Sequence, residues 1–256
     1  MSNLVTDASL PAGLVALVDK YANVQPRPVR FRPATWQQAL VGARASLRVT
    51  ALLRDGAFTT PIPGSKAGDR TVTRAAALRA CTTMDLGDEK EVLQAFVLTM
   101  AWGSEGGVGN PSLRATARAL RNAERTYRGL SESARRLRAA ATLQDGALEQ
   151  NHRSWSLRPV GQSFASRWWN LAGHVPARSW QPLILDERVY ASLNRTLMIG
   201  GTTRLASSRR RADRYRAYVE TLHRWSVELG LGGRTVDAER IAFVLGLHNG
   251  AAVPTG

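Results

Sequence analysis

Several kinds of site are excluded by what the sequence lacks. There is one cysteine, Cys81, in 256 residues, so the chain cannot form an internal disulfide, a Cys-rich zinc site or an iron–sulfur cluster. The four histidines do not fall at metal-ligand spacing, and no cluster of carboxylates suggests a two-metal nuclease. The signatures of zinc deaminases, Walker A loops and dinucleotide-binding folds are also missing. We therefore expect no metal and no other cofactor.

Long apolar runs are missing as well. No stretch approaches the roughly 20 apolar residues that a membrane-spanning helix needs. The N-terminus has no basic region before an apolar core, which is the mark of a secretory signal. Low cysteine usage is typical of a reducing compartment. We expect a soluble, cytoplasmic protein that acts as a monomer and has no membrane partner.

Lysine is scarce, yet positive charge is in excess. The chain has 35 Lys and Arg against 20 Asp and Glu, a formal net charge of +15, and the only lysines are Lys20, Lys66 and Lys90. This excess predicts attraction to polyanions, with nucleic acid as the first candidate and an anionic membrane surface as the second. The planar fork of arginine suits phosphates and base edges. A GC-rich genome explains the arginine bias equally well, but it does not explain the net charge.

Helical periodicity dominates the chain and predicts an all-α fold, or nearly so. Alternation typical of strands occurs only at residues 29–32 and 197–199, while residues 54–73 and 103–111 predict loops. Thr35 and Asp88 are predicted N-caps. The predicted helices cover residues 10–24, 36–43, 74–80, 89–102, 112–127, 131–143, 186–194, 212–229 and 236–245. A glycine turn and the helix that it opens cover residues 157–172. We expect an N-terminal helical region, 1–88, and a core, 89–256, that pack as one unit.

Two short motifs follow one another in the second half of the chain. The first, Gly-Gln-Ser-Phe-Ala-Ser-Arg at positions 161–167, is a glycine turn that opens a helix. The second, Leu-Ile-Leu-Asp-Glu-Arg-Val at positions 183–189, is an apolar run that ends on Asp186 at the start of another helix. Amides at a helix start can hold a phosphate. A carboxylate at a helix start stays ionised because the helix dipole favours negative charge there.

Over residues 90–230 the chain resembles the helix-hairpin-helix DNA glycosylases, and more specifically the bacterial proteins of the 8-oxoguanine glycosylase fold. In those proteins a pattern similar to residues 161–167 opens the hairpin helix, and an apolar run followed by Asp-x-x-Val carries the catalytic aspartate. The resemblance implies a two-lobed fold and an enzyme that flips a modified base out of double-stranded DNA. It implies that Asp186 is the catalytic carboxylate, whereas the residue taken by itself is more simply an N-cap.

Arg167 stands where the bifunctional members of that family carry a lysine nucleophile. A guanidinium does not deprotonate to attack the sugar, and no lysine follows Lys90. We therefore expect neither the Schiff-base route nor the strand cleavage that it supports. The resemblance and this substitution together predict a monofunctional glycosylase. Asp186 would stabilise an oxocarbenium-like sugar and orient a water molecule, leaving an abasic site.

The other candidate residues form two sets. A base pocket combines aromatic faces with polar groups, among which Glu105 could read an exocyclic amino group; its members are Trp102, Glu105, Arg167, Trp168 and His223. A DNA-binding set combines the hairpin with arginines; its members are Gly161, Gln162, Ser163, Ser166, Arg204, Arg209, Arg210 and Arg211. Each residue has a simpler alternative in a loop, the core or a solvated face. A basic stripe faces either DNA or water; it consists of Arg114, Arg118, Arg121 and Arg125.

The identity of the base is left open between two substrates. Relatives in the resembled group include anti-phage glycosylases that excise glucosylated hydroxymethylcytosine, and a pocket rich in tryptophan and arginine suits a sugar. The alternative is a repair glycosylase that acts on 8-oxoguanine. A rival of another class is a non-catalytic DNA-binding protein that uses the same hairpin and arginines. An RNA-binding helical protein is a further rival, although the usual RNA-module signatures are missing.

Overall fold

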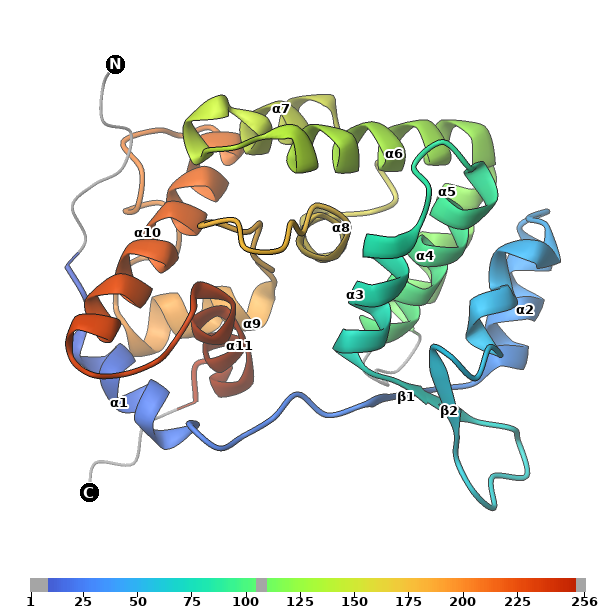
Figure 1. The fold of residues 1–256 in the computed structure, drawn as a ribbon, viewed down its shortest axis with the longest axis horizontal. Coiled ribbons are helices and arrows are strands. Elements are labelled where there is room, and N and C mark those ends of the chain that lie inside the picture. Colours follow the sequence, from blue (N-terminus) through green and yellow to red (C-terminus); the bar gives the residue numbers. More distant parts are fainter. Residues whose placement is uncertain (1–8, 105–109, 252–256) are drawn as a thin grey trace. The chain divides into compact units, whose positions relative to one another are not determined.

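The structure is a computed structural model that describes residues 9–104 and 110–251. These residues are mostly helical, with one small antiparallel sheet, so the predicted fold class is confirmed (Figure 1). None of the described helices is both long and apolar enough to span a membrane. The α-helices are α1 (Ala12–Lys20), α2 (Pro33–Gly42), α3 (Arg74–Thr83), α4 (Glu89–Trp102), α5 (Pro111–Leu120), α6 (Ala123–Ala139), α7 (Ala147–Ser154), α8 (Gln162–Ala172), α9 (Glu187–Ala191), α10 (Arg211–Leu231) and α11 (Ala238–His248). The strands are β1 (Val29–Phe31), β2 (Thr59–Pro61) and β3 (Arg70–Val72); η1 (Leu47–Leu53) and η2 (Leu143–Asp145) are 3-10 helices, and η3 (Ser192–Thr196) is a π-helix.

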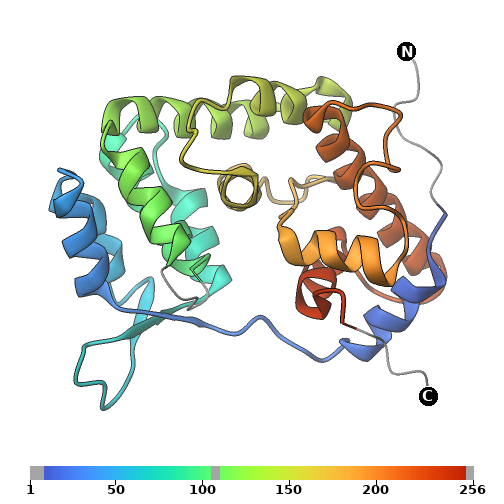
Figure 2. The same cartoon turned by 180° about the vertical axis from the view of Figure 1, so that it is seen from behind.

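The described residues form two compact units that interleave along the chain. Unit 1 contains α1, α7, α9, α10 and α11, and unit 2 contains the sheet, α2 to α6 and α8 (Figures 1 and 2). In sequence, unit 1 takes residues 9–25, 140–154 and 176–251, and unit 2 takes 26–104, 110–139 and 155–175. The expected boundary at residue 88 does not separate them, because residues on both sides of it belong to unit 2.

The sheet of unit 2 has the strand order β1-β3-β2, and both strand pairs are antiparallel. β1 confirms the strand predicted at residues 29–32. The loop predicted at residues 54–73 is wrong in part, because it contains β2 and β3, which are too short to show a clear alternation. The strand suggested at residues 197–199 is also wrong. That segment follows η3, and Met198 has a left-handed φ of 54°.

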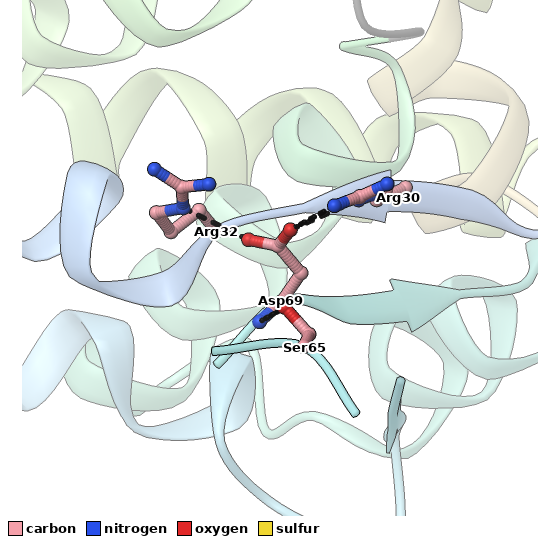
Figure 3. A network of polar contacts seen from close by, with 4 residues as sticks. All are labelled: Arg30, Arg32, Ser65 and Asp69. Carbon is pink, nitrogen blue, oxygen red and sulfur yellow. Dashed lines mark hydrogen bonds and ion pairs between the residues drawn. The ribbon is translucent and has the colours of Figure 1, made fainter. Parts of the chain in front are cut away.

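A buried carboxylate next to β3 ties that strand to β1 (Figure 3). The Asp69 side chain is only 3% exposed and pairs with two arginines. It accepts hydrogen bonds from Arg32 Nε at 2.9 Å and from Arg30 Nε at 3.0 Å, while its own amide donates to Ser65 Oγ at 3.1 Å. The hydrogen bonds from Arg32 and Arg30 lower the pKa of Asp69 from 3.8 to about 2. These donors stabilise the negative charge of the buried Asp69 carboxylate.

A capping aspartate marks the start of α4, and a proline in the first turn marks the start of α2. Asp88 is the N-cap of α4, as predicted, and its Oδ1 accepts from the amide of Lys90 at 2.8 Å. The predicted cap at Thr35 is wrong, because α2 begins at Pro33. Proline suits the first helical turn, where its missing N–H costs nothing. All residues of α4 from Val92 to Ala101 are buried, so this helix forms the core of unit 2.

The break between α5 and α6 differs from the prediction. The periodicity predicted one helix to residue 127 and a second from 131, whereas the structure ends α5 at Leu120 and runs α6 without a break through 123–139. The cause is Asn122, whose Oδ1 accepts from the amide of Arg125 at 2.9 Å. An asparagine in this position caps a new helix start.

In unit 1, α7 packs against the N-terminal half of α10 (Figures 1 and 2). Arg216 Nη1 lies 2.9 Å from Glu149 Oε1, and this pair is largely buried. The His152 ring stands edge-on to the Tyr215 ring, with the centroids 5.0 Å apart. Burial, followed by the charge of Arg211, lowers the pKa of His152 to about 4. His152 is therefore a neutral packing residue near neutral pH.

We predict that Asp69→Asn destabilises the protein at neutral pH and flattens its stability profile in acid. The folded-state pKa is lowered, so the stabilisation is complete above the ordinary value of 3.8 and is lost as the pH falls towards about 2. Denaturant unfolding across this pH range measures the effect. Glu132→Gln, at an exposed position of α6, is the control. Parallel stability profiles for the wild type and Asp69→Asn would contradict the prediction.

Candidate functional site

The extended segment 181–185 of unit 1 leads to Asp186 and lies along α10. The Tyr215 phenol donates a hydrogen bond to the carbonyl of Leu183 at 2.7 Å, and the Tyr218 phenol donates to the carbonyl of Ile184 at 2.8 Å. Both tyrosines are fully buried. Burial raises the pKa of each phenol, so both remain protonated donors. The carbonyls of an isolated extended segment are thereby satisfied without a neighbouring strand.

His223 holds the beginning of the same segment. Its Nε2 lies 3.0 Å from the amide nitrogen and 3.1 Å from the carbonyl oxygen of Gln181. Burial lowers the pKa of His223, and the hydrogen bond with Gln181 opposes that shift. The sequence predicted His223 as a base-pocket residue. Its contacts give it a role in positioning the segment that ends at Asp186.

Asp186 is the N-cap of α9. Its Oδ1 accepts hydrogen bonds from the amides of Arg188 at 3.1 Å and Val189 at 3.2 Å. The backbone of Asp186 is extended and its side chain is half-buried. The carboxylate is therefore fixed in direction by the helix start and also supported by the helix dipole. Both cap bonds are accepted by one carboxylate oxygen, Oδ1.

The end of α9 is locked to α11 through one buried serine. Ser192 Oγ donates to the carbonyl of Leu245 at 2.6 Å and accepts from the amide of Gly250 at 2.9 Å. Gly250 has a left-handed φ of 66°, and a Cβ there would lie 2.8 Å from the carbonyl oxygen of Ala191. Only glycine fits this approach. Asp186 thus stands between a segment fixed to α10 and a helix fixed to α11.

In unit 2, the turn before α8 is held by Trp155. Its Nε1 donates to the carbonyl of Val160 at 3.0 Å, and its ring stands edge-on to that of Trp169, with the centroids 5.4 Å apart. The amide of Val160 donates to the carbonyl of Leu157 at 2.8 Å, which closes the turn. The turn therefore has a defined shape that does not depend on the glycine that follows it.

Gly161 is the N-cap of α8, and no side chain caps this helix. Its φ of −64° is open to any residue, and a Cβ at this position would meet nothing within 4 Å. The backbone at this position therefore does not require glycine. What the glycine provides is an uncovered helix start. The amides of Gln162 and Ser163 have no acceptor within the helix.

Arg167 connects α8 to the end of α4. Its Nη1 donates to the carbonyl of Gly103 at 2.6 Å, and its guanidinium lies 5.5 Å from the centroid of the Phe164 ring. A cation at a helix C-terminus is favoured by the dipole. The half-buried Trp102 precedes Gly103 and ends α4. The structure thus brings together two of the predicted pocket residues, Arg167 and Trp102, within unit 2.

Two other predicted residues are placed differently. Trp168 is fully buried, and its Nε1 donates to Ser133 Oγ at 3.1 Å, which makes it a core residue and argues against its prediction as a pocket wall. Ser166 is also fully buried and donates to the carbonyl of Ser163 at 3.0 Å, which argues against a contact with DNA. Glu105 lies outside the described residues.

The arginines at 209–211 surround the start of α10 and are exposed. Positive charge at a helix N-terminus opposes the dipole. Ser208 and Asp213 offset part of this effect, because Ser208 Oγ donates to Asp213 Oδ2 at 2.6 Å and accepts from the amide of Arg210 at 3.1 Å. Arg204, in the preceding loop, is exposed as well. The stability of the helix does not account for this cluster.

Three residues that the sequence analysis did not single out fix the backbone next to the two motifs. Tyr215, Tyr218 and Trp155 each donate to a backbone carbonyl next to a motif. The Tyr-x-x-Tyr spacing on α10 is the one signal that could have pointed to a shared partner. In residues 9–104 and 110–251, no group of three His, Cys, Asp or Glu side chains is arranged to hold a metal ion.

The chain matches the model of a known family. A model of the family described as “Putative 8-oxoguanine DNA glycosylase OGG-like protein” matches residues 22–243. This region contains both motifs, 161–167 and 183–189. Neither the curated proteins nor the solved structures contain a match to the chain.

We predict that Tyr218→Phe lowers the free energy of unfolding by about 1–3 kcal/mol, because it leaves the partly buried carbonyl of Ile184 without its donor. Denaturant unfolding followed by fluorescence measures the loss. Tyr190→Phe is the matched control, since the half-buried Tyr190 hydroxyl makes no hydrogen bond within the described residues. Equal losses for the two variants would show that the hydroxyl of Tyr218 does not hold the segment.

Proposed function

The chain belongs to the family described as “Putative 8-oxoguanine DNA glycosylase OGG-like protein”, and on that premise we propose that it is a monofunctional DNA glycosylase. Its substrate is duplex DNA with a modified base, which is flipped from the stack before the bond is broken. The observation that carries the proposal is the placement of Asp186. This carboxylate lies within the matched region, at a helix start, on a segment fixed by buried hydrogen bonds.

The proposed reaction is hydrolysis of the N-glycosidic bond. The bond between C1′ and the base nitrogen breaks, and positive charge develops on the sugar, where the Asp186 carboxylate stabilises it. The oxygen of a water molecule bonds to C1′. Asp186 takes up one proton of that water, and the departing base takes up a proton from solvent. The two cap bonds fix the direction of the Asp186 side chain at the start of α9.

The absence of a lysine at position 167 supports the monofunctional assignment. Arg167 is held against Gly103, and a guanidinium does not form a Schiff base. The only lysines of the chain are Lys20, Lys66 and Lys90, none of which lies in either motif. Water is then the nucleophile, and the product is an intact strand with an abasic site.

DNA binding is proposed to use the uncovered start of α8 and the arginines at 204 and 209–211. The amides of Gln162 and Ser163 suit a backbone phosphate. The exposed guanidinium groups before α10 oppose the helix dipole, and a phosphate would relieve that repulsion. Trp102 and Arg167 remain the proposed contributors to the base pocket, together with Glu105.

Two substrates are compared to identify the base. The family description points to 8-oxoguanine, while glucosylated hydroxymethylcytosine suits a pocket of tryptophan and arginine and would place the protein in anti-phage defence. Abasic sites are counted after incubation with duplexes that carry one or the other modification. Product from 8-oxoguanine alone assigns base-excision repair, and product from the glucosylated base alone assigns defence. Binding without product from either supports a DNA-binding protein.

We predict that Asp186→Asn lowers the single-turnover rate of base release by about 10²–10⁴-fold. Asparagine caps a helix as well as aspartate does, so folding and DNA affinity are expected to stay close to the wild type. The matched control is Glu187→Gln, which removes an exposed carboxylate from the next position. Unchanged base release by Asp186→Asn would remove this residue from the mechanism.

We predict that Gly161→Ala weakens DNA binding about tenfold while the free energy of unfolding falls by no more than about 1 kcal/mol. The added methyl meets no protein atom within 4 Å, but it stands where a phosphate would approach the amides. Anisotropy with a labelled duplex and denaturant unfolding are the two measurements. Gly230→Ala, where a Cβ also meets nothing within 4 Å, is the control. Equal DNA affinities for the two variants would contradict phosphate binding at α8.

A further inference from the structure

Unit 2 contains a pocket that neither motif includes. It has a volume of about 330 Å³ and lies between the end of α5, the start of α6 and the turn before α8. Three arginines line it: Arg118, Arg125 and Arg158. No lining residue is acidic. The pocket is therefore a concave surface of positive charge in a part of the chain for which the proposed mechanism has no use.

Among residues 9–104 and 110–251, no carboxylate neutralises the positive charge of the pocket. Within the described part of the chain, neither Arg118 nor Arg158 pairs with a carboxylate. The nearest acidic residue in sequence, Glu124, is paired with Arg128. Arg125 donates to the carbonyl of Ser156 at 3.3 Å, a neutral acceptor. Three guanidinium groups held near one another without a counter-ion repel each other, and an anion would remove that repulsion.

The walls of the pocket are fixed by backbone contacts. Thr126 Oγ1 donates to the carbonyl of Ala119 at 2.7 Å, which holds the start of α6 against the end of α5. A Cβ at Gly129 would lie 3.5 Å from Leu157 Cγ and from Ser156 Oγ, so the turn before α8 packs closely on α6. The pocket is thus preformed by two helix ends and a closed turn.

The size and lining of the pocket indicate a nucleotide unit. The volume of about 330 Å³ exceeds that of one phosphate group and leaves room for an attached sugar. Ala119, Leu157 and Pro159 offer apolar surface for the sugar, while the arginines and Asn122 offer donors to the phosphate. Forked guanidinium donors match the oxygens of a phosphate.

The pocket is also close to the uncovered start of α8. The chain from Arg158 to Gly161 spans at most about 11 Å. Each strand of B-DNA carries a phosphate for about every 3.4 Å of helix axis. A strand whose phosphate is held by the α8 amides therefore brings a neighbouring phosphate within reach of Arg158.

We propose that this pocket is a second phosphate site for DNA, in which Arg118, Arg125 and Arg158 bind a backbone phosphate and its sugar beside the hairpin. The inference rests on the proposed function, because it takes DNA as the ligand. It adds a position to the DNA path that the two motifs do not contain. It also divides the basic stripe predicted from the sequence, since Arg118 and Arg125 line the pocket while Arg114 and Arg121 do not.

The test is the salt dependence of binding to an unmodified duplex, measured by anisotropy with the full chain. The pocket variant carries Arg118→Ala and Arg158→Ala. The control carries Arg114→Ala and Arg121→Ala, which removes the same charge from exposed positions of the same region. The expected result is a salt slope lower by about 1 in the pocket variant, with affinity reduced about tenfold. The control is expected to keep the wild-type slope.

Other outcomes separate this inference from the proposed function. Equal slopes for the pocket variant and the control would overturn the pocket as a phosphate site, while base release by the wild type would leave the glycosylase intact. Failure of the wild type to bind DNA would overturn both. Inorganic phosphate and a poly-glutamate peptide are titrated in parallel. Loss of binding to either one in the pocket variant, with an unchanged DNA slope, would assign the pocket to a free anion or an acidic protein and would overturn the proposal.

Discussion

Two buried hydrogen bonds, from Tyr215 and Tyr218 to successive backbone carbonyls, hold the segment on which the proposed chemistry depends. An extended segment without a neighbouring strand has no backbone partners of its own. The phenols on α10 supply them, and burial keeps the phenols protonated. His223 holds the beginning of the segment and Ser192 holds the helix after it. Asp186 therefore sits at a junction whose two sides are each fixed.

The second constraint is positive charge, which the contacts of the fold do not require. Arginines cluster at the start of α10 and around the α5–α6 pocket. Ser208 and Asp213 compensate the first cluster in part. Gly161 is likewise not required by the fold, because the backbone at this position is open to other residues. Features of this kind are expected where a polyanionic ligand binds.

The sequence predicted those features that depend on neighbouring residues. An apolar run after Asp88 was enough for α4, and the turn and carboxylate motifs placed α8 and Asp186 at helix starts. Features that depend on distant partners were not predictable. Helix α7 was missed because it buries Glu149 and Asn151, and the partner of Glu149 comes from α10.

The same limit applies to the candidate site. Two adjacent tryptophans cannot be assigned to core or pocket from spacing, and both Trp168 and Trp169 are buried. The α5–α6 pocket depends on a cap at Asn122 inside what the periodicity predicts as one helix. The hydroxyls of Tyr215 and Tyr218 find carbonyls that only the tertiary fold brings to them. The motifs could therefore be located from local sequence patterns. The side chains that fix their backbone could be identified only from tertiary contacts.

In the proposed mechanism Asp186 acts with water, and no amine nucleophile takes part. The most direct test is to incubate the wild-type protein with a duplex from which it releases a base and to add borohydride, which traps a Schiff base between protein and DNA. Hydrolysis by water predicts abasic sites, strand breaks only after hot alkali, and no trapped complex. A covalent protein–DNA complex, or strand cleavage without alkali, would contradict it.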